Sequence, residues 1–332
     1  MVQTERMVDV IRGPICESWH SGFAVVTNAA GEVVEGWGDL DHVILPRSAV
    51  KMMQALPLVA SGAADRAGLD DSQLAFACAS HNGDPVHVAK ARAWLETLGL
   101  GEDDLICGVQ KPMGDKARHD MLRAGETPCR VHNNCSGKHC GFLTLSQDLK
   151  ADGDYVNPDH PVQVAIREAI EAVTGEASLG YGIDGCSAPN YAATVRGLGR
   201  GLAYFAAARA DGDAMARAAV RLREAMMAHP VLVAGEGRAC TDLMRAAGGK
   251  AAIKTGAEGV FTAILPDQGL GVAVKIADGA TRASECAIAA LLVKLGVLDG
   301  NDPVVKKRLN PEVPNFAGII TGEIRPYAGF PA

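Results

Sequence analysis

The segments with β-strand character in this chain stand near its two ends, and the long stretch between them has helical spacing. Residues 22–27 (G-F-A-V-V-T) and 32–37 (E-V-V-E-G-W) flank a short polar turn that ends in glycine, which predicts a β-hairpin. Residues 251–256, 259–266 and 269–276 are three short β-rich runs separated by glycine, which predict an antiparallel meander. If the two ends pair into one sheet, the helices between them form a second lobe.

The middle of the chain is expected to be mainly helical. Apolar periodicity predicts helices over residues 48–61, 84–98, 136–147, 160–174, 213–228 and 281–296. The run L-A-F-A-C-A, residues 74–79, is expected to be a strand. The fold class is therefore α/β (α+β): an antiparallel sheet flanked by helices plus a helical lobe. We expect a single two-lobed catalytic domain over residues 1–332, with the sheet from about 5–40 and 250–330 and the helical lobe from about 48–245.

Composition and charge narrow the class of partner. The chain has 332 residues, 48% of them hydrophobic, and a net charge of −7 that is spread along the sequence. No basic stripe favours nucleic acid or an anionic membrane, and no apolar run reaches the roughly 20 residues of a membrane helix, so we expect a small-molecule substrate. Without a recognisable export signal we expect a cytoplasmic protein, in which nine cysteines favour buried thiols or metal ligands over disulfides.

Ser48 and Lys51 are the first candidates for chemistry. They stand at i and i+3 in R-S-A-V-K, so one face of a helix would carry both. A lysine that is partly neutral, a state that burial favours, can accept the serine proton and make the serine a nucleophile. The alternative is that Ser48 is only a helix N-cap.

Two further patterns add weight to the catalytic interpretation. S-H-N at residues 80–82 is a serine-x-asparagine element, and K-T-G at residues 254–256 lies on an expected strand. The set S-x-x-K, S-x-N and K-T-G resembles the plan of serine β-lactamases and penicillin-binding proteins, although Ser80 follows Ser48 more closely than in those enzymes. Alternatively, Ser80 belongs to a polar turn, and His81 and Asn82 orient a substrate.

A third cluster combines cysteines with a rigid loop. Cys135, His139 and Cys140 have ligand chemistry, but their spacing is not a standard zinc pattern, so a metal and buried thiols both stay open. The loop D-G-C-S-A-P-N contains Asp184 and Cys186, and its glycine and proline favour a fixed display of polar side chains.

Taken together, four blocks resemble the rhizobial-type L-asparaginase family, also called the asparaginase II or thermolabile type. These are R-S-A-V-K-M-M-Q-A, A-S-H-N-G-D-P, N-N-C-S-G-K-H-C-G-F and G-I-D-G-C-S-A-P. The resemblance implies a fold related to serine β-lactamases and glutaminases, a homodimer, and hydrolysis of L-asparagine to L-aspartate and ammonia.

The resemblance also implies residue roles. It implies two Ser-Lys pairs, Ser48 with Lys51 and Ser80 with Lys254, where Lys254 is preferred to Lys275 for its place in the meander. It further implies a zinc ion held by Cys135, Lys138 and Cys186, although the residues alone would favour His139 over the lysine.

The mechanism that follows is acyl transfer. Lys51 takes the proton of Ser48, whose oxygen attacks the side-chain amide, and backbone N–H groups hold the oxyanion. Water activated by Ser80 and Lys254, or again by Lys51, then releases aspartate. Ser80 as the nucleophile is the internal alternative.

Candidate residues for holding the substrate are Arg47, His81, Asn82 and Asp184, and a guanidinium suits the α-carboxylate.

Three other functions stay open. A glutaminase or another small-amide hydrolase would use the same pairs, because one methylene discriminates weakly. A penicillin-recognising enzyme would be exported, and a zinc-binding non-catalytic module would use the cysteines structurally.

Overall fold

The computed structural model describes residues 2–331, which form two compact units. A sheet unit contains the residues up to Ala49, Ala193–Ala207 and the residues from Asp242 onward. A helical unit contains Val50–Ala192 and Ala208–Thr241. That the two units work together as one catalytic domain stays a prediction.

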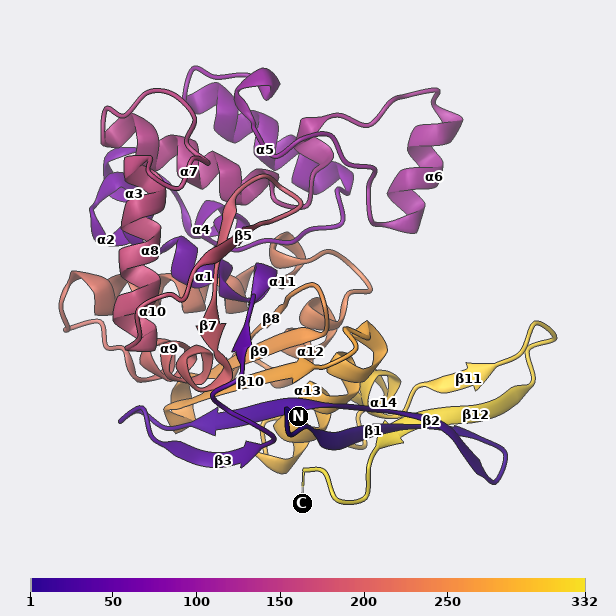
Figure 1. Cartoon of the computed structure of the whole chain (residues 1–332). Helices are drawn as coiled ribbons and strands as arrows, with labels where there is room; N and C mark the ends of the chain where they lie inside the picture. The colour runs from indigo at the N-terminus through magenta and orange to yellow at the C-terminus, as the bar shows by residue number, and fades with distance from the viewer. Residues whose placement is uncertain (1, 332) are drawn as a thin grey trace. The chain divides into compact units, whose positions relative to one another are not determined.

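The sheet unit is built from both ends of the chain and one helix from its middle (Figure 1). Its elements are β1 (Glu5–Arg12), β2 (Ile15–Thr27), β3 (Val33–Trp37), β4 (Val43–Ile44), the 3-10 turn η1 (Arg47–Val50), β7 (Ala193–Thr194), α9 (Val195–Ala207), α12 (Ala239–Ala247), β8 (Ala252–Thr255), β9 (Val260–Leu265), η4 (Pro266–Gln268), β10 (Leu270–Ile276), α13 (Thr281–Lys294), α14 (Pro303–Leu309), β11 (Glu312–Pro314) and β12 (Ile320–Pro326). The unit boundaries cut η1 after Ala49 and α12 after Thr241.

The main sheet is antiparallel, in the order β11-β12-β1-β2-β10-β9-β8, with β3 also paired to β2. Strand β2 joins the two ends of the chain, because its first half pairs with β1 and its second half pairs with β10. The helices α9 and α13 both pack on β9 and β10. Strand β9 is accordingly buried along its whole length, as expected for a strand that is covered on both faces.

Close backbone approach fixes α9 on this sheet. A Cβ atom at Gly271 would lie 2.3 Å from the backbone nitrogen of Ala203, and one at Gly199 would lie 2.5 Å from the Thr27 hydroxyl. Glycine at both contacts lets the helix backbone lie directly on β2 and β10.

The helical unit consists mainly of short helices around one buried helix. Its elements are α1 (Lys51–Gln54), α2 (Leu56–Ala60), α3 (Ala63–Arg66), α4 (Asp71–Ala77), α5 (Pro85–Thr97), η2 (Glu102–Asp104), α6 (Asp115–Arg123), η3 (Arg130–His132), α7 (Ser136–Asp148), α8 (Pro161–Thr174), β5 (Tyr181–Ile183), β6 (Pro189–Tyr191), α10 (Ala214–Ala228) and α11 (Pro230–Val233). Helix α7 is buried on every side from Ser136 to Ser146 and packs on α2, α3, α4, α5 and α8.

The predicted fold class is confirmed: a mixed α/β chain with an antiparallel sheet and a helical unit. The hairpin, the meander and the helices expected over 84–98, 136–147, 160–174, 213–228 and 281–296 are all present.

Two predictions of secondary structure were wrong. The helix expected over 48–61 is three short pieces, η1, α1 and α2, because Pro57 has no N–H to continue the helix and instead begins α2. Residues 74–79 contain the end of helix α4 and not a strand, since Asp70 and Gln73 form a capping box that starts a helix there.

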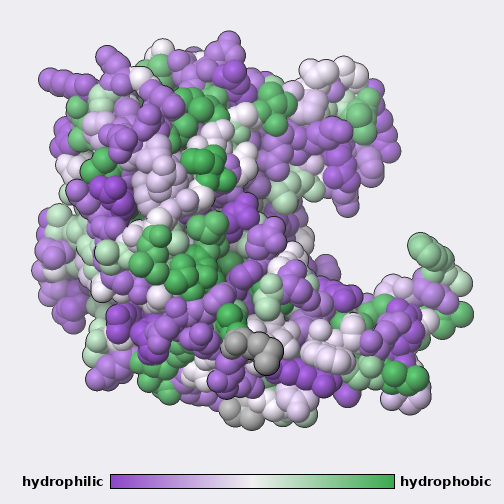
Figure 2. Space-filling view, viewed as in Figure 1, coloured by the Kyte–Doolittle hydropathy of each residue, from purple (hydrophilic) through white to green (hydrophobic). Residues whose placement is uncertain are grey.

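The surface of the sheet unit carries one apolar projection. The hairpin of β11 and β12 exposes Phe316, Ile319 and Ile320, and Figure 2 shows apolar side chains at its tip. Within residues 2–331, no helix is both long and apolar enough to cross a membrane.

Candidate active site

Ser48 lies in the 3-10 turn η1, directly after Arg47. Arg47 has a φ of 55°, in the left-handed region that side chains other than glycine rarely adopt. The N-cap of the following helix α1 is Val50, and no side chain caps it. Ser48 is therefore not the N-cap of α1, which removes the simplest structural explanation for this serine.

The K-T-G strand holds η1 in the sheet unit. Thr262 on β9 donates its hydroxyl to the carbonyl of Lys254 at 3.1 Å and to that of Ala49 at 3.4 Å. A Cβ atom at Gly256 would lie 2.7 Å from the carbonyl oxygen of Pro46, so glycine is required for this approach. The structure thus brings the segment of Ser48 against the segment of Lys254. The Lys254 side chain is buried, and its Nζ donates to the Thr255 carbonyl at 2.8 Å.

Left-handed backbone gathers at the predicted motifs. Among residues 2–331, four residues other than glycine have positive φ: Arg47, Lys150, Ser187 and Glu258. Three of these stand in or next to R-S-A-V-K, D-G-C-S and K-T-G. Such conformations cost on the order of 1–3 kcal/mol each and cluster at functional sites, so their positions support the catalytic interpretation of these motifs.

Lys51 is buried in the helical unit, with only 1% of its surface exposed. Its ammonium donates to the carbonyl of Ala79, the residue before Ser80, and to the sulfur of Cys135 at 3.0 Å. One lysine therefore links the S-H-N element with the cysteine cluster. Ser48 and Lys51 are three residues apart in consecutive helical segments, and their catalytic pairing stays a prediction, as does that of Ser80 with Lys254, which belong to different units.

Ser80, His81 and Asn82 form a buried loop of the helical unit. The N–H of Ser80 donates to the Val233 carbonyl at 2.9 Å, and the N–H of His81 donates to the Asn134 carbonyl at 3.1 Å. The Asn82 side chain receives a hydrogen bond from Arg238 at 3.1 Å and donates one to the Glu236 carbonyl at 3.2 Å. This loop is fixed by its neighbours, as a preorganised site requires.

His81 has protein partners at both ring nitrogens. The N–H of Gly83 donates to Nδ1 at 3.0 Å, so Nε2 carries the hydrogen and donates to the Ser136 hydroxyl at 2.9 Å. Burial lowers the pKa of His81 well below 6.5, and the charges of His87 and Lys51 lower it further. A neutral, fully engaged imidazole holds the loop; a substrate contact by His81 would require breaking one of these bonds.

Cys135, Cys186 and Lys138 come together in the helical unit. Lys138 Nζ donates to Cys186 Sγ at 3.1 Å. A hydrogen bond from the Cys135 thiol and the Lys138 ammonium hold the pKa of Cys186 well below its usual range, against the effect of burial. The same hydrogen bond and burial raise the pKa of Cys135. Of the two side chains, Cys186 therefore loses its proton more readily.

These residues fit a zinc ion in their chemistry. Thiolate sulfur is a preferred ligand of zinc, and a lysine can ligate it only after losing its proton. Within residues 2–331, no three His, Cys, Asp or Glu side chains gather as a metal site, and a zinc site that includes Lys138 stays a prediction.

His139 lies next to this cluster on α7. Its Nδ1 is 2.9 Å from the Tyr155 hydroxyl, whereas its buried Nε2 has no hydrogen-bond partner among the described residues. Burial lowers the pKa of His139 more than the Cys186 thiolate raises it. His139 therefore borders the Cys186 side of this cluster.

Asp184 and Cys186 belong to the turn between β5 and β6. The Asp184 carboxylate accepts the Gly185 N–H at 2.7 Å, and its backbone bonds Ala188 and Ser187. Burial lowers the pKa of Lys138, but the neighbouring Cys186 and Cys135 sulfurs raise it by more, and the Asp184 charge adds a smaller rise. These hydrogen bonds hold the turn in its conformation.

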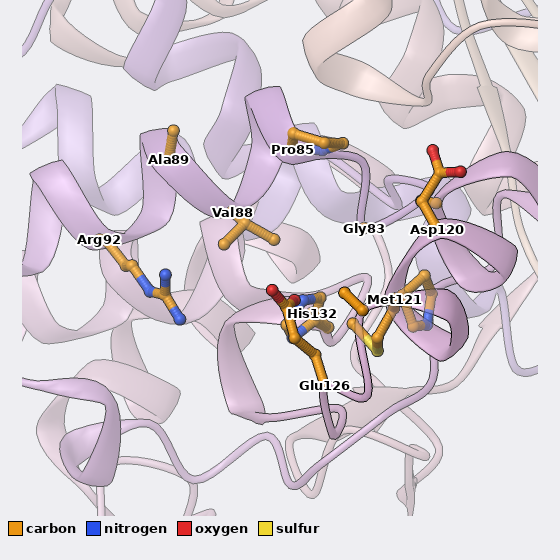
Figure 3. A pocket seen from close by; sticks show the side chains of 12 residues that line it. Gly83, Pro85, Val88, Ala89, Arg92, Asp120, Met121, Glu126 and His132 are labelled. Carbon is orange, nitrogen blue, oxygen red and sulfur yellow. The ribbon is translucent and has the colours of Figure 1, made fainter.

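A cavity of about 420 Å³ lies between α5 and α6 in the helical unit. Figure 3 shows Val88, Met121, Glu126 and His132 around it. None of the residues proposed for catalysis, substrate or zinc lines it, so we do not place the reaction there.

Several residues of these sites carry no sequence signal. Thr262 donates to the Lys254 carbonyl, and the Ala79 carbonyl accepts from Lys51; both hydrogen bonds exist only in the folded chain. Tyr155 is sixteen residues from its partner His139. Glu258 has one signal, its place two residues after K-T-G, which sequence reasoning did not use.

Comparison with known proteins gives the family. The family model for L-asparaginase II matches residues 8–326. No curated protein sequence matches the chain. A crystal structure of Mglu in its native form is 12% identical, with a TM-score of 0.43 over 88% of this chain and 68% of that chain. Two other Mglu structures are covered over 64% and 61% of their length, so the chain spans about two thirds of Mglu.

A putative β-lactamase from Bacteroides dorei is 14% identical, with a TM-score of 0.41 over 78% of this chain and 87% of that chain. The family match is the stronger finding, because it covers nearly the whole sequence and includes all four quoted blocks. The chain belongs to the L-asparaginase II family of amidohydrolases.

Proposed function

We propose that the protein hydrolyses L-asparagine to L-aspartate and ammonia through an ester formed on Ser48. The observation that carries this proposal is the family match over residues 8–326, within which all the proposed catalytic residues lie. The placement of η1 on the K-T-G strand and the burial of Lys51 support it.

In the first half of the reaction, a deprotonated Lys51 takes the hydroxyl proton of Ser48 while the serine oxygen attacks the side-chain carbonyl of the substrate. Backbone N–H groups hold the oxyanion. Collapse of the tetrahedral intermediate breaks the C–N bond, and the nitrogen leaves as ammonia with the proton that Lys51 returns. An aspartyl ester on Ser48 remains.

In the second half, water attacks the ester. Ser80 with Lys254, or Lys51 again, takes the proton of that water and returns it to the Ser48 oxygen as the ester bond breaks and aspartate is released. Arg47 holds the α-carboxylate, since a guanidinium forms two parallel hydrogen bonds with a carboxylate. Asn82 and Asp184 are proposed substrate-binding residues on their preorganised loops.

Zinc is part of this proposal. Cys135, Lys138 and Cys186 would hold it, and a bound zinc ion supplies Lewis acidity that polarises a carbonyl or water. The family resemblance also implies a homodimer, which light scattering of the purified protein measures.

Ammonia release from L-asparagine and from L-glutamine, compared on the purified protein, tests the proposed substrate. A pocket that fits the shorter amide discriminates against one methylene by about 10- to 200-fold. A faster rate on L-glutamine would assign the chain as a glutaminase that uses the same residues. No release from either, with zinc supplied, would favour the non-catalytic zinc-binding alternative.

A further inference from the structure

We propose that Glu258 is a specificity residue that binds the α-ammonium group of the substrate, opposite Arg47 at the α-carboxylate. This inference rests on the proposed function, and it adds the recognition of a zwitterion to it. An α-amino acid amide carries both charges on one carbon, so two opposite side chains at one place select it from simple amides.

The carboxylate of Glu258 and the guanidinium of Arg47 face one another in the sheet unit. Their nearest nitrogen and oxygen, Arg47 Nη1 and Glu258 Oε1, are 4.0 Å apart. A closed ion pair of the same unit, Arg6 with Asp9, has a distance of 2.7 Å. The wider separation at Arg47 leaves opposite charges facing each other without a normal hydrogen bond between them.

The Arg47 side chain is mostly buried and the Glu258 side chain is mostly exposed, as expected for a binding site at the surface. Arg47 has 25% of its side-chain surface exposed, whereas Glu258 has 68% exposed. A carboxylate that is open to solvent can exchange its water shell for an incoming ammonium group.

The backbone of Glu258 is held in a rare conformation. Its φ is 56°, and its carbonyl accepts a hydrogen bond from the Lys275 ammonium. Gly279 lies beside the carboxylate, since a Cβ atom there would lie 2.8 Å from Glu258 Oε2. Backbone strain that neighbours maintain is typical of functional positions.

Arg47 is held in the same way from the other side. Its φ is 55°, and the close approach of Gly256 to the Pro46 carbonyl fixes the turn that begins with it. Gly256 lies between Lys254 and Glu258 along the chain. The K-T-G segment therefore brings Glu258 to the residue next to Ser48, so the charged pair stands beside the proposed nucleophile.

The test compares two substrates in the parent and in Glu258→Gln. L-asparagine carries the α-ammonium group, and succinamic acid is the same molecule without it. We expect kcat/KM for L-asparagine to fall by about 10- to 100-fold, as for the loss of a hydrogen bond to a charged group. The value for succinamic acid is expected to change by no more than about two-fold.

Inhibition gives the same contrast without turnover of the analogue. L-aspartate is expected to inhibit Glu258→Gln about 10- to 100-fold more weakly than the parent, whereas succinate inhibits both alike. Asp267→Asn, an exposed site at the other end of β9, is the matched control and is expected to behave as the parent. Glu258→Asn is a second variant, because asparagine tolerates the positive φ at this position. The same loss in this variant would show that the effect does not come from a folding defect.

An equal fall on both substrates, or no fall on L-asparagine, would overturn the role of Glu258. Failure of the proposed function is seen separately, because the parent itself would then release no ammonia from either compound.

Discussion

The ammonium group of Lys51 lies 3.0 Å from the sulfur of Cys135, so the proposed base and a proposed zinc ligand share one environment. Cys135 and Lys138 both lower the pKa of Cys186, whose sulfur accepts a hydrogen bond from Lys138. The charges of these groups depend on one another, and a change at one is expected to alter the others.

Replacement of Lys51 by methionine is expected to lower kcat by about 10²- to 10⁴-fold, because a general base is lost while the buried volume is kept. Steady-state ammonia release measures the effect. Lys90→Met, at a partly exposed lysine on α5, is the control and is expected to retain activity. Retention of full activity by Lys51→Met would exclude Lys51 as the base.

Replacement of Cys186 by serine is expected to abolish zinc binding, because it removes the thiolate of the cluster. Metal analysis of purified protein, before and after a chelator, measures the zinc content. Cys286→Ser is the matched control, since that buried thiol on α13 donates only to a backbone carbonyl in the described residues and stands outside the cluster. Equal zinc in the two variants would contradict the proposed ligand set.

Acidification is expected to destabilise the fold through His81 and His87. Burial lowers the pKa of both imidazoles from 6.5, so below about pH 6.5 the unfolded chain binds protons that the native state does not bind. Stability is therefore full above pH 6.5 and decreases as the pH falls, by up to about 1.4 kcal/mol per pH unit for each group. Urea unfolding at pH 7.5, 6.5 and 5.5 measures this.

The control for this pH dependence is His119→Gln, at an exposed position on α6, which is expected to keep the same slope. A free energy of unfolding that stays constant between pH 7.5 and 5.5 would contradict the neutral state of the two buried imidazoles.

Replacement of Gly137 by alanine is expected to destabilise the protein by about 3 kcal/mol, because the new Cβ would lie 2.2 Å from the Phe76 carbonyl oxygen and force α7 away from α4. Gly101→Ala, where a Cβ meets only the Asp104 carboxylate at 4.0 Å, is the control. Thermal unfolding compares the two, and equal midpoints would mean that α7 can move without cost.

Much of the fold could be predicted because its signals are local. The hairpin of β2 and β3 has alternating residues around a polar turn, and the meander has glycine between its strands. Helix α9 was not predicted, since glycines lower helix propensity, and Gly199 serves the close approach of the helix to β2. The error at residues 74–79 has a similar cause: a short apolar run does not distinguish a strand from a buried helix.

The candidate site was predictable where a motif contains its own chemistry and not where folding supplies the partner. Cys135 and Cys186 are 51 positions apart, and only the family resemblance joined them. From the residues alone His139 was preferred to Lys138, because a protonated lysine is a poor ligand. The Lys138 ammonium donates to the Cys186 sulfur at 3.1 Å, and zinc binding by the two residues stays a prediction. Glu258 could be recognised as a candidate only from its positive φ and its distance from Arg47 in the structure.

Ammonia release from L-asparagine by Ser48→Ala, beside the parent and Ser80→Ala, tests the central claim most directly. We predict that the parent is active and that Ser48→Ala loses at least about 10³-fold in kcat, because no ester can form. Activity of Ser48→Ala close to that of the parent, in the same assay, would contradict Ser48 as the nucleophile.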